Sequence, residues 1–177
     1  EDYWCAMAEM HAIGGTRVVK SKFRELWHHQ NLKLRSEWRK AIKKELSTLH
    51  TIKKCWRVVK RSSMPRGKKP LNGIWIFAEK FDANGVFIKC KARFCIQGFA
   101  QIYFGKTYSP TMSKVTLRVF SAISARLGLQ IFTVDVVAAC LNAPLDEPEY
   151  LNIRPEFAEV LEDNSLKDPE AIFLMQV

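Results

Sequence analysis

Residues 129–151 read LQIFTVDVVAACLNAPLDEPEYL, and the rest of the chain can be organised around this stretch. Its first half is an apolar run rich in β-branched residues and interrupted by one carboxylate, Asp135. Such a run is typical of a strand that is buried on both faces. An unpaired aspartate is costly inside a core, so we expect Asp135 at the end of the strand, exposed or opposite a cation. The alternative is that Asp135 opens a turn or caps a helix over residues 137–142.

The charge of the 177-residue chain is unevenly distributed. The formal net charge is +10, and residues 16–69 hold 18 lysines and arginines against three glutamates. From Asp135 onward the balance reverses, with ten acidic residues against Arg154 and Lys167. A basic first half predicts a polyanionic partner, whereas a merely solvated charged surface would mix the two signs more evenly. The chain begins with Glu1 and stops in an apolar run, which suggests a fragment of a larger protein.

The cysteines and histidines show no metal-ligand pattern. The five cysteines include no Cys-x-x-Cys pair, and the four histidines lack ligand-like spacing. Neither a zinc site nor a disulfide framework is therefore indicated, and a reducing compartment fits best. The sequence contains no signal peptide and no apolar run of about 20 residues, so we expect no membrane span and no membrane partner.

Local patterns predict both helices and strands. A helix is expected from Ser36, with basic residues on its outer side that are either solvated or in contact with phosphates. One stripe of this helix comprises Trp38, Ala41, Ile42, Glu45, Leu46 and Leu49. A strand is expected over residues 55–59, and a second helix over residues 113–127, capped by Ser113 and stopped by Gly128. The buried side of that second helix is predicted to carry Leu117, Phe120, Ile123 and Leu127. This order of elements predicts an α+β fold.

A long hairpin is predicted over residues 74–97, with a tight turn at residues 82–85. The first strand alternates, with Trp75, Phe77 and Phe81 on one face and Ile74, Ile76 and Ala78 on the other. On the return strand one face should carry Phe87, Lys89, Lys91 and Arg93, and the other Val86, Ile88, Cys90 and Ala92. Such a cationic stripe can grip phosphates; the alternative is an ordinary hairpin with a solvated face.

Seven short motifs follow one another along the chain. They are Trp38-x-x-Ala41-x-x-x-Glu45, Trp56-x-Val58, Trp75-Ile-Phe77, Lys91-Ala-Arg93-Phe-x-x-Gln97-Gly98-Phe99-x-Gln101, Thr107-Tyr-Ser-Pro110, Thr116-Leu-Arg118 and Val134-Asp135-Val-x-x-Ala139-x-Leu141-Asn142. Together they resemble the reverse transcriptase domain of copia-type LTR retrotransposon Pol polyproteins, over roughly residues 38–155. The resemblance implies the fingers and the first part of the palm of a right-hand polymerase fold. We therefore expect a leader or linker over residues 1–35, a reverse transcriptase-like domain over 36–155 and a truncated palm continuation over 156–177.

The resemblance also implies an activity and the residues that serve it. Reverse transcriptases join a deoxynucleotide triphosphate to a primer by in-line phosphoryl transfer, assisted by two Mg²⁺ ions. By resemblance, Asp135 is catalytic and binds metal together with the backbone at Val136. The residues implied to bind the incoming nucleotide are Lys91, Arg93, Val136 and Cys140. Those implied to lie against the template are Gln97, Gly98 and Gln101. The implied partners are an RNA or DNA template-primer, deoxynucleotide triphosphates and the remaining Pol polyprotein domains.

The chain departs from the family pattern at several positions. The family's paired-aspartate hairpin should follow well after residue 155, but no Asp-Asp occurs in the chain. One carboxylate cannot hold two metal ions, so we expect no polymerisation by this chain alone. Cys140 stands where the family usually carries a bulky aromatic that screens out a 2′-hydroxyl. The alternatives are a non-enzymatic nucleic-acid-binding module or a non-functional remnant of such an element. The expected localisation is a cytoplasmic particle or the nucleus, not the secretory route.

Overall fold

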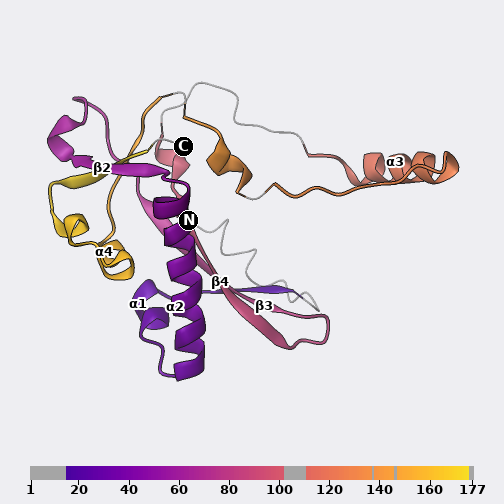
Figure 1. Ribbon diagram of the computed structural model, residues 1–177, viewed down its shortest axis with the longest axis horizontal. Coiled ribbons are helices and arrows are strands. Elements are labelled where there is room, and N and C mark those ends of the chain that lie inside the picture. Colours follow the sequence, from indigo (N-terminus) through magenta and orange to yellow (C-terminus); the bar gives the residue numbers. More distant parts are fainter. Residues whose placement is uncertain (1–14, 102–110, 137, 146, 176–177) are drawn as a thin grey trace. The chain divides into compact units, whose positions relative to one another are not determined.

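The computed structural model describes residues 15–101, 111–136, 138–145 and 147–175. The chain divides into two units, one formed by residues 1–101 and 140–177 and the other by residues 102–139, and each is described by itself (Figure 1). Among the described residues, the first unit contains two small antiparallel sheets together with helices, and the second contains helix 114–126. The predicted α+β class is therefore confirmed. None of the described helices is long and apolar enough to cross a membrane.

The first sheet is built on the predicted hairpin. Strands β1 (Thr16–Val19), β3 (Gly73–Phe81) and β4 (Phe87–Ile96) pair antiparallel in the order β1-β3-β4. The carboxylate of Asp82 accepts hydrogen bonds from the backbone N–H groups of Asn84 and Val86, at 2.9 and 2.8 Å, and Gly85 adopts a φ of +78°. Because glycine has no Cβ, it takes this left-handed conformation without strain. The turn predicted at residues 82–85 is confirmed.

The hairpin differs from the prediction at one position near the turn. Lys80 pairs with Lys89, but Phe81 pairs with Phe87, so Ile88 is an extra residue on β4. Such a bulge reverses the alternation of the strand beyond it. Phe87 was predicted on the same face as Lys89, and this is wrong. The bulge places Phe87 beside Phe81, with the two ring centroids 6.1 Å apart, and leaves the basic face without that aromatic side chain.

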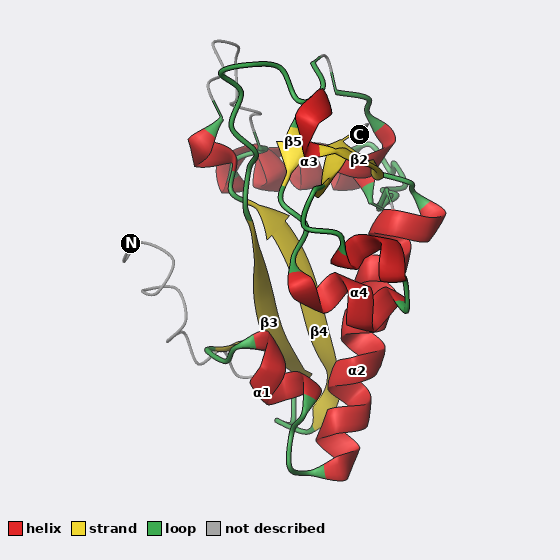
Figure 2. Cartoon of the chain, turned by 90° about the vertical axis from the view of Figure 1, so that its left-hand side faces the viewer, coloured by secondary structure: helices red, strands yellow, loops and turns green. Residues whose placement is uncertain are grey.

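Helix α2 (Leu32–Ser47) covers the inner face of this sheet, as Figure 2 shows. It begins four residues before Ser36, because the Asn31 side chain caps it by accepting hydrogen bonds from the N–H groups of Lys33 and Leu34. The predicted apolar stripe is confirmed, since Trp38, Ile42 and Leu46 are fully buried. Trp38 meets the β3 residue Phe77 edge to face, with ring centroids 5.6 Å apart.

Glu45 of α2 holds the outer strand of the sheet. Its Oε1 accepts a hydrogen bond of 3.1 Å from the backbone N–H of Phe94, on β4. Because β4 is an edge strand, this N–H has no further strand to pair with. The motif glutamate at position 45 therefore fastens helix α2 to the hairpin.

We expect Glu45→Ala to lower the free energy of unfolding by about 1–3 kcal/mol, because it removes the acceptor for a partly buried N–H. Glu45→Gln keeps a carbonyl oxygen and should lose less. Urea unfolding followed by tryptophan fluorescence measures both values. Lys44→Ala, at an exposed position on the same helix, is the control. Equal effects of Glu45→Ala and Lys44→Ala would show that the hydrogen bond contributes nothing.

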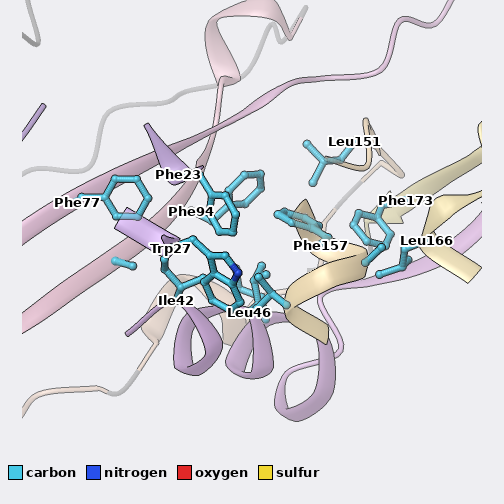
Figure 3. Packing of buried hydrophobic residues seen from close by; sticks show 14 of the residues in the cluster. Phe23, Trp27, Ile42, Leu46, Phe77, Phe94, Leu151, Phe157, Leu166 and Phe173 are labelled. Atoms are coloured by element: carbon cyan, nitrogen blue, oxygen red, sulfur yellow. The ribbon is translucent and has the colours of Figure 1, made fainter. Parts of the chain in front are cut away.

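The second sheet and the helix beside it complete the core of the first unit. Strands β2 (Trp56–Lys60), β6 (Ala171–Met175) and β5 (Tyr150–Leu151) pair antiparallel in the order β2-β6-β5. The strand predicted at residues 55–59 is confirmed, shifted by one residue. Helix α4 (Pro155–Leu161) places Phe157 between the two sheets. Its ring centroid lies 4.9 Å from that of Phe94 and 5.9 Å from that of Phe173 (Figure 3).

Residues on both sides of the expected 36–155 domain belong to this core. Strand β1 pairs with β3, and the side chains of Phe23, Leu26 and Trp27 on helix α1 (Phe23–Trp27) are buried. The Trp27 indole N–H donates to the Glu159 carboxylate of α4 at 2.5 Å. Residues 16–27, placed by the sequence in a leader or linker, are thus packed into the first unit.

In the described residues of the second unit, helix α3 (Lys114–Arg126) is followed by a segment without regular secondary structure. The predicted cap is confirmed, because the Ser113 hydroxyl accepts a 3.1 Å hydrogen bond from the Thr116 N–H. The chain leaves the helix at Gly128, with a φ of +63°. The second unit by itself does not bury the predicted side of the helix: Leu117, Phe120 and Ile123 are about half exposed and Leu127 is 64% exposed.

The strand predicted around Asp135 does not form in the described residues. Residues 129–136 have no regular secondary structure, and Val134 is 88% exposed. A strand requires a hydrogen-bonding partner, and no other strand is described in the second unit. The expectation of a strand buried on both faces is therefore wrong for residues 129–136; Val137 lies outside the described residues. A 3₁₀ turn (Ala139–Asn142) follows it in the chain.

Candidate nucleic-acid interface

The outer face of the β3–β4 hairpin is a row of cations. Alternation directs the side chains of Lys89, Lys91 and Arg93 to the face opposite helix α2. Their cross-strand partners on β3 are Lys80, Ala78 and Ile76, in that order. The predicted basic stripe is therefore confirmed. The register extends it to a fourth cation, Lys80.

These four cations lack acidic partners within the described part of the chain. None of them takes part in an ion pair there, and Lys89 and Arg93 are exposed. Partial burial and the neighbouring positive charges of Arg93 and Lys80 lower the pKa of Lys91. The charged form of Lys91 is therefore disfavoured, and an anion bound on this face would relieve that cost.

The inner face of the hairpin has the opposite electrostatic character. Arg17 of β1 forms an ion pair with Glu79 of β3, and its guanidinium also lies over the Phe81 ring, 5.5 Å from the centroid. Arg17 is thus paired on the face that packs against α2, whereas the cations of the outer face form no ion pair in the described residues.

The basic face of helix α2 is only partly available to a ligand. Lys40 pairs with Glu37 at 2.9 Å, and Lys43 pairs with Glu162 at 3.1 Å. The Arg39 guanidinium lies over the Trp27 ring, 5.0 Å from its centroid. Much of the charge predicted to contact phosphates on this helix is therefore used within the fold.

The residues predicted to lie against a template follow strand β4. The Gln97 N–H donates to the Asn72 carbonyl at 2.8 Å, and Gly98 begins a 3₁₀ turn (Gly98–Ala100). A Cβ built on Gly98 would meet nothing within 4 Å, so the fold itself does not require glycine here. The Gln101 amide donates to the buried Glu149 carboxylate at 3.2 Å. Gln101 is thus engaged inside the first unit, whereas the backbone at Gly98 is open.

The residues predicted to hold metal and nucleotide do not all belong to one unit. Lys91 and Arg93 lie together on β4 in the first unit, while Asp135 and Val136 lie in the second unit and are exposed. Cys140, in the 3₁₀ turn Ala139–Asn142, belongs to the first unit. The structure thus brings together the two cations of the predicted nucleotide site.

The donor set in the described residues does not fit a two-metal centre. Asp135 is the only carboxylate in its apolar segment, and no three histidine, cysteine, aspartate or glutamate side chains gather into a ligand group in the described ranges. Two divalent ions held about 3.5–4 Å apart need several oxygen ligands. We therefore derive no catalytic step through a metal ion.

The sequence did not predict two features of the hairpin, namely the place of Lys80 in the basic row and the hydrogen bond from β4 to Glu45. Lys80 was not assigned to the basic stripe, although the even-numbered positions 74, 76, 78 and 80 share one face. Glu45 was read only as part of an apolar stripe and a motif, and its hydrogen bond to β4 had no sequence signal. Counting the strand pairs outward from the turn at residues 82–85 would have placed Lys80 on the same face as Lys89.

The described residues define a mixed α and β protein whose hairpin presents four cations on one face. Comparison with known proteins gives the family. Residues 53–169 match the family described as reverse transcriptase (RNA-dependent DNA polymerase), and the chain belongs to this family. Reverse transcriptases generally use divalent metal ions and act on a nucleic-acid template.

The curated relatives are much longer than this chain. The chain is 32% identical over 124 residues to the retrovirus-related Pol polyprotein from transposon TNT 1-94 of Nicotiana tabacum. The aligned region covers 68% of this chain and 9% of that protein. It is 27% identical over 88 residues to the corresponding polyprotein from transposon RE2 of Arabidopsis thaliana, covering 48% of this chain and 6% of that protein. The chain thus spans less than a tenth of the length of either relative. No solved structure gives a significant match.

Proposed function

We propose that this chain is part of an RNA-directed DNA polymerase of a copia-type retrotransposon, comprising the fingers and the first part of the palm of a right-hand fold. The observation that carries the proposal is the row of four cations on the outer face of β3–β4, without acidic partners in the described residues. In a polymerase this face neutralises the phosphates of a template-primer and of the incoming deoxynucleotide triphosphate.

Within this proposal, Lys91 and Arg93 hold the triphosphate of the incoming nucleotide. The lowered pKa of Lys91 supports this role, because a bound polyphosphate replaces repulsion from Arg93 with attraction. We assign Val136 and Cys140 to the same nucleotide site by resemblance to the family. Cys140, in place of a bulky aromatic, should screen a 2′-hydroxyl less strictly.

The template strand is proposed to pass the end of β4. The open surface at Gly98 supports this path, because a backbone without Cβ lets a nucleic-acid strand approach closely. Gln97 and Gln101 flank that glycine. For Gln101 to contact a template, its amide would have to give up the hydrogen bond to Glu149.

Asp135 is proposed as a catalytic aspartate and, with the Val136 backbone, as a ligand of Mg²⁺. Because the described residues do not complete a two-metal site, the other carboxylates would come from the rest of a Pol polyprotein. We accordingly propose that this chain does not polymerise by itself. The proposed domain is residues 36–155, and the proposed localisation is a cytoplasmic particle or the nucleus.

A non-enzymatic nucleic-acid-binding module is the second candidate function. The observation that favours it is the row of four cations on the hairpin, which needs no metal ion to bind phosphates. Both candidates require nucleic-acid binding, so they share a first test.

Fluorescence anisotropy with a labelled RNA–DNA primer-template tests this shared requirement. We expect the logarithm of the association constant to fall linearly with the logarithm of the salt concentration between about 50 and 200 mM, because neutralised phosphates release counterions. Primer extension with Mg²⁺ by this chain joined to the remaining domains of a Pol polyprotein, with Asp135→Asn as the control, then separates the two candidates. Absence of salt-dependent binding would contradict both.

A further inference from the structure

The cationic row extends to the outer end of the hairpin, beyond Lys91 and Arg93. Lys80 and Lys89 occupy directly opposite positions on β3 and β4. Residues so paired have Cβ atoms about 4.5–5.5 Å apart, and like charges there destabilise a sheet. Neither lysine has an ion-pair partner in the part of the chain that the structure describes, and the β1 residue beside Lys80 is the uncharged Thr16.

The row is longer than the pair of cations assigned to the triphosphate. Lys89, Lys91 and Arg93 alternate along β4, so their successive Cα atoms are about 6.6 Å apart and the three span about 13 Å. Lys89 therefore lies one step beyond Lys91 and Arg93 along the strand.

We infer that Lys80 and Lys89 form a second phosphate site, which holds the backbone of single-stranded nucleic acid beyond the phosphates bound by Lys91 and Arg93. This inference rests on the proposed function, which supplies the nucleic acid. A phosphate bound between the two lysines neutralises the two positive charges that the strand register places opposite each other. The bulge at Ile88 keeps Phe87 off this face and so leaves the site open.

The first experiment compares two ligands on two double variants of the full chain. Lys80→Gln/Lys89→Gln should weaken binding of a short oligo(U) RNA about tenfold and lower its salt slope by about 0.7, as expected for one lost phosphate. The same variant should bind deoxythymidine triphosphate as the unaltered chain does. Lys33→Gln/Lys44→Gln, which removes two exposed charges from α2, should leave oligo(U) binding within about twofold.

A second measurement separates a binding site from a structural role. Lys89→Glu places opposite charges across the hairpin, so it should raise the urea midpoint of unfolding while weakening oligo(U) binding. A lower midpoint would instead show that the lysine pair supports the fold, and would overturn the inference.

The outcomes distinguish this inference from the proposed function. If Lys80→Gln/Lys89→Gln binds oligo(U) like the unaltered chain while Lys91→Gln/Arg93→Gln does not, the second site is wrong and the proposed function stands. If the unaltered chain binds neither ligand in a salt-dependent way, both fail. If a polyglutamate peptide binds as tightly as oligo(U) and is equally weakened by Lys80→Gln/Lys89→Gln, the ligand is an acidic peptide and the inference is overturned.

Discussion

Lys91→Glu/Arg93→Glu is expected to weaken primer-template binding about a hundredfold or more. Each lost charge-assisted hydrogen bond costs about 1.5–3 kcal/mol, and every 1.4 kcal/mol is about tenfold in affinity. Reversing the charge adds repulsion of the phosphates. The salt slope should also fall by about 1.4–1.8, because two phosphates are no longer neutralised. Fluorescence anisotropy over a salt series measures both quantities.

The matched control reverses two charges elsewhere on the basic surface. Lys33→Glu/Lys44→Glu changes the net charge by the same amount at exposed positions of α2, so it reports the effect of the overall field. We expect this control to weaken binding much less than Lys91→Glu/Arg93→Glu. Equal losses in the two variants would mean that binding follows net charge alone and that the hairpin holds no site.

Phe157→Ala is expected to produce the largest loss of stability, about 3–5 kcal/mol, because it empties a fully buried aromatic position. The ring touches both sheets: its centroid lies 4.9 Å from Phe94 on the hairpin and 6.2 Å from Trp56 on β2. Since small domains are stable by only about 5–15 kcal/mol, the variant should be near its unfolding threshold. Urea unfolding followed by circular dichroism measures the change.

The matched control for this core residue is a phenylalanine on the surface. Phe99 is 87% exposed, so Phe99→Ala should change the free energy of unfolding by no more than about 0.5 kcal/mol. A small loss in Phe157→Ala would indicate that the two sheets do not share one core, and the first unit would then be wrongly described.

The parts of the fold that the sequence predicted correctly depend on local patterns. The β3–β4 hairpin follows from alternation and from the Asp82 turn, and the start of α3 follows from the Ser113 cap. The bulge at Ile88 could not be predicted, because it arises where Phe81 pairs with Phe87. This pairing shifts the register of the two strands by one residue. The basic stripe was predicted in part: Lys91 and Arg93 were assigned to it, whereas Lys80 was missed although it shares a face of β3 with Ile76 and Ala78.

The parts that failed depend on contacts distant in sequence. An apolar run such as residues 131–136 predicts a strand only if another strand pairs with it, and composition carries no information about that partner. The same holds for the apolar side of α3, which is amphipathic in sequence but exposed in the second unit. The joining of residues 16–27 to the core likewise depends on pairing between β1 and β3, more than 50 residues apart.

Nuclear magnetic resonance of the isotope-labelled chain, titrated with a short oligo(U) RNA, tests the central claim most directly. That claim is that nucleic acid binds the outer face of the β3–β4 hairpin. If nucleic acid binds this face, the amide signals of Ile76, Lys89 and Lys91 should shift in a salt-sensitive way. The amide signals of Lys33 and Lys44 on α2 should stay unchanged. Shifts confined to α2, with the hairpin signals unmoved, would contradict it.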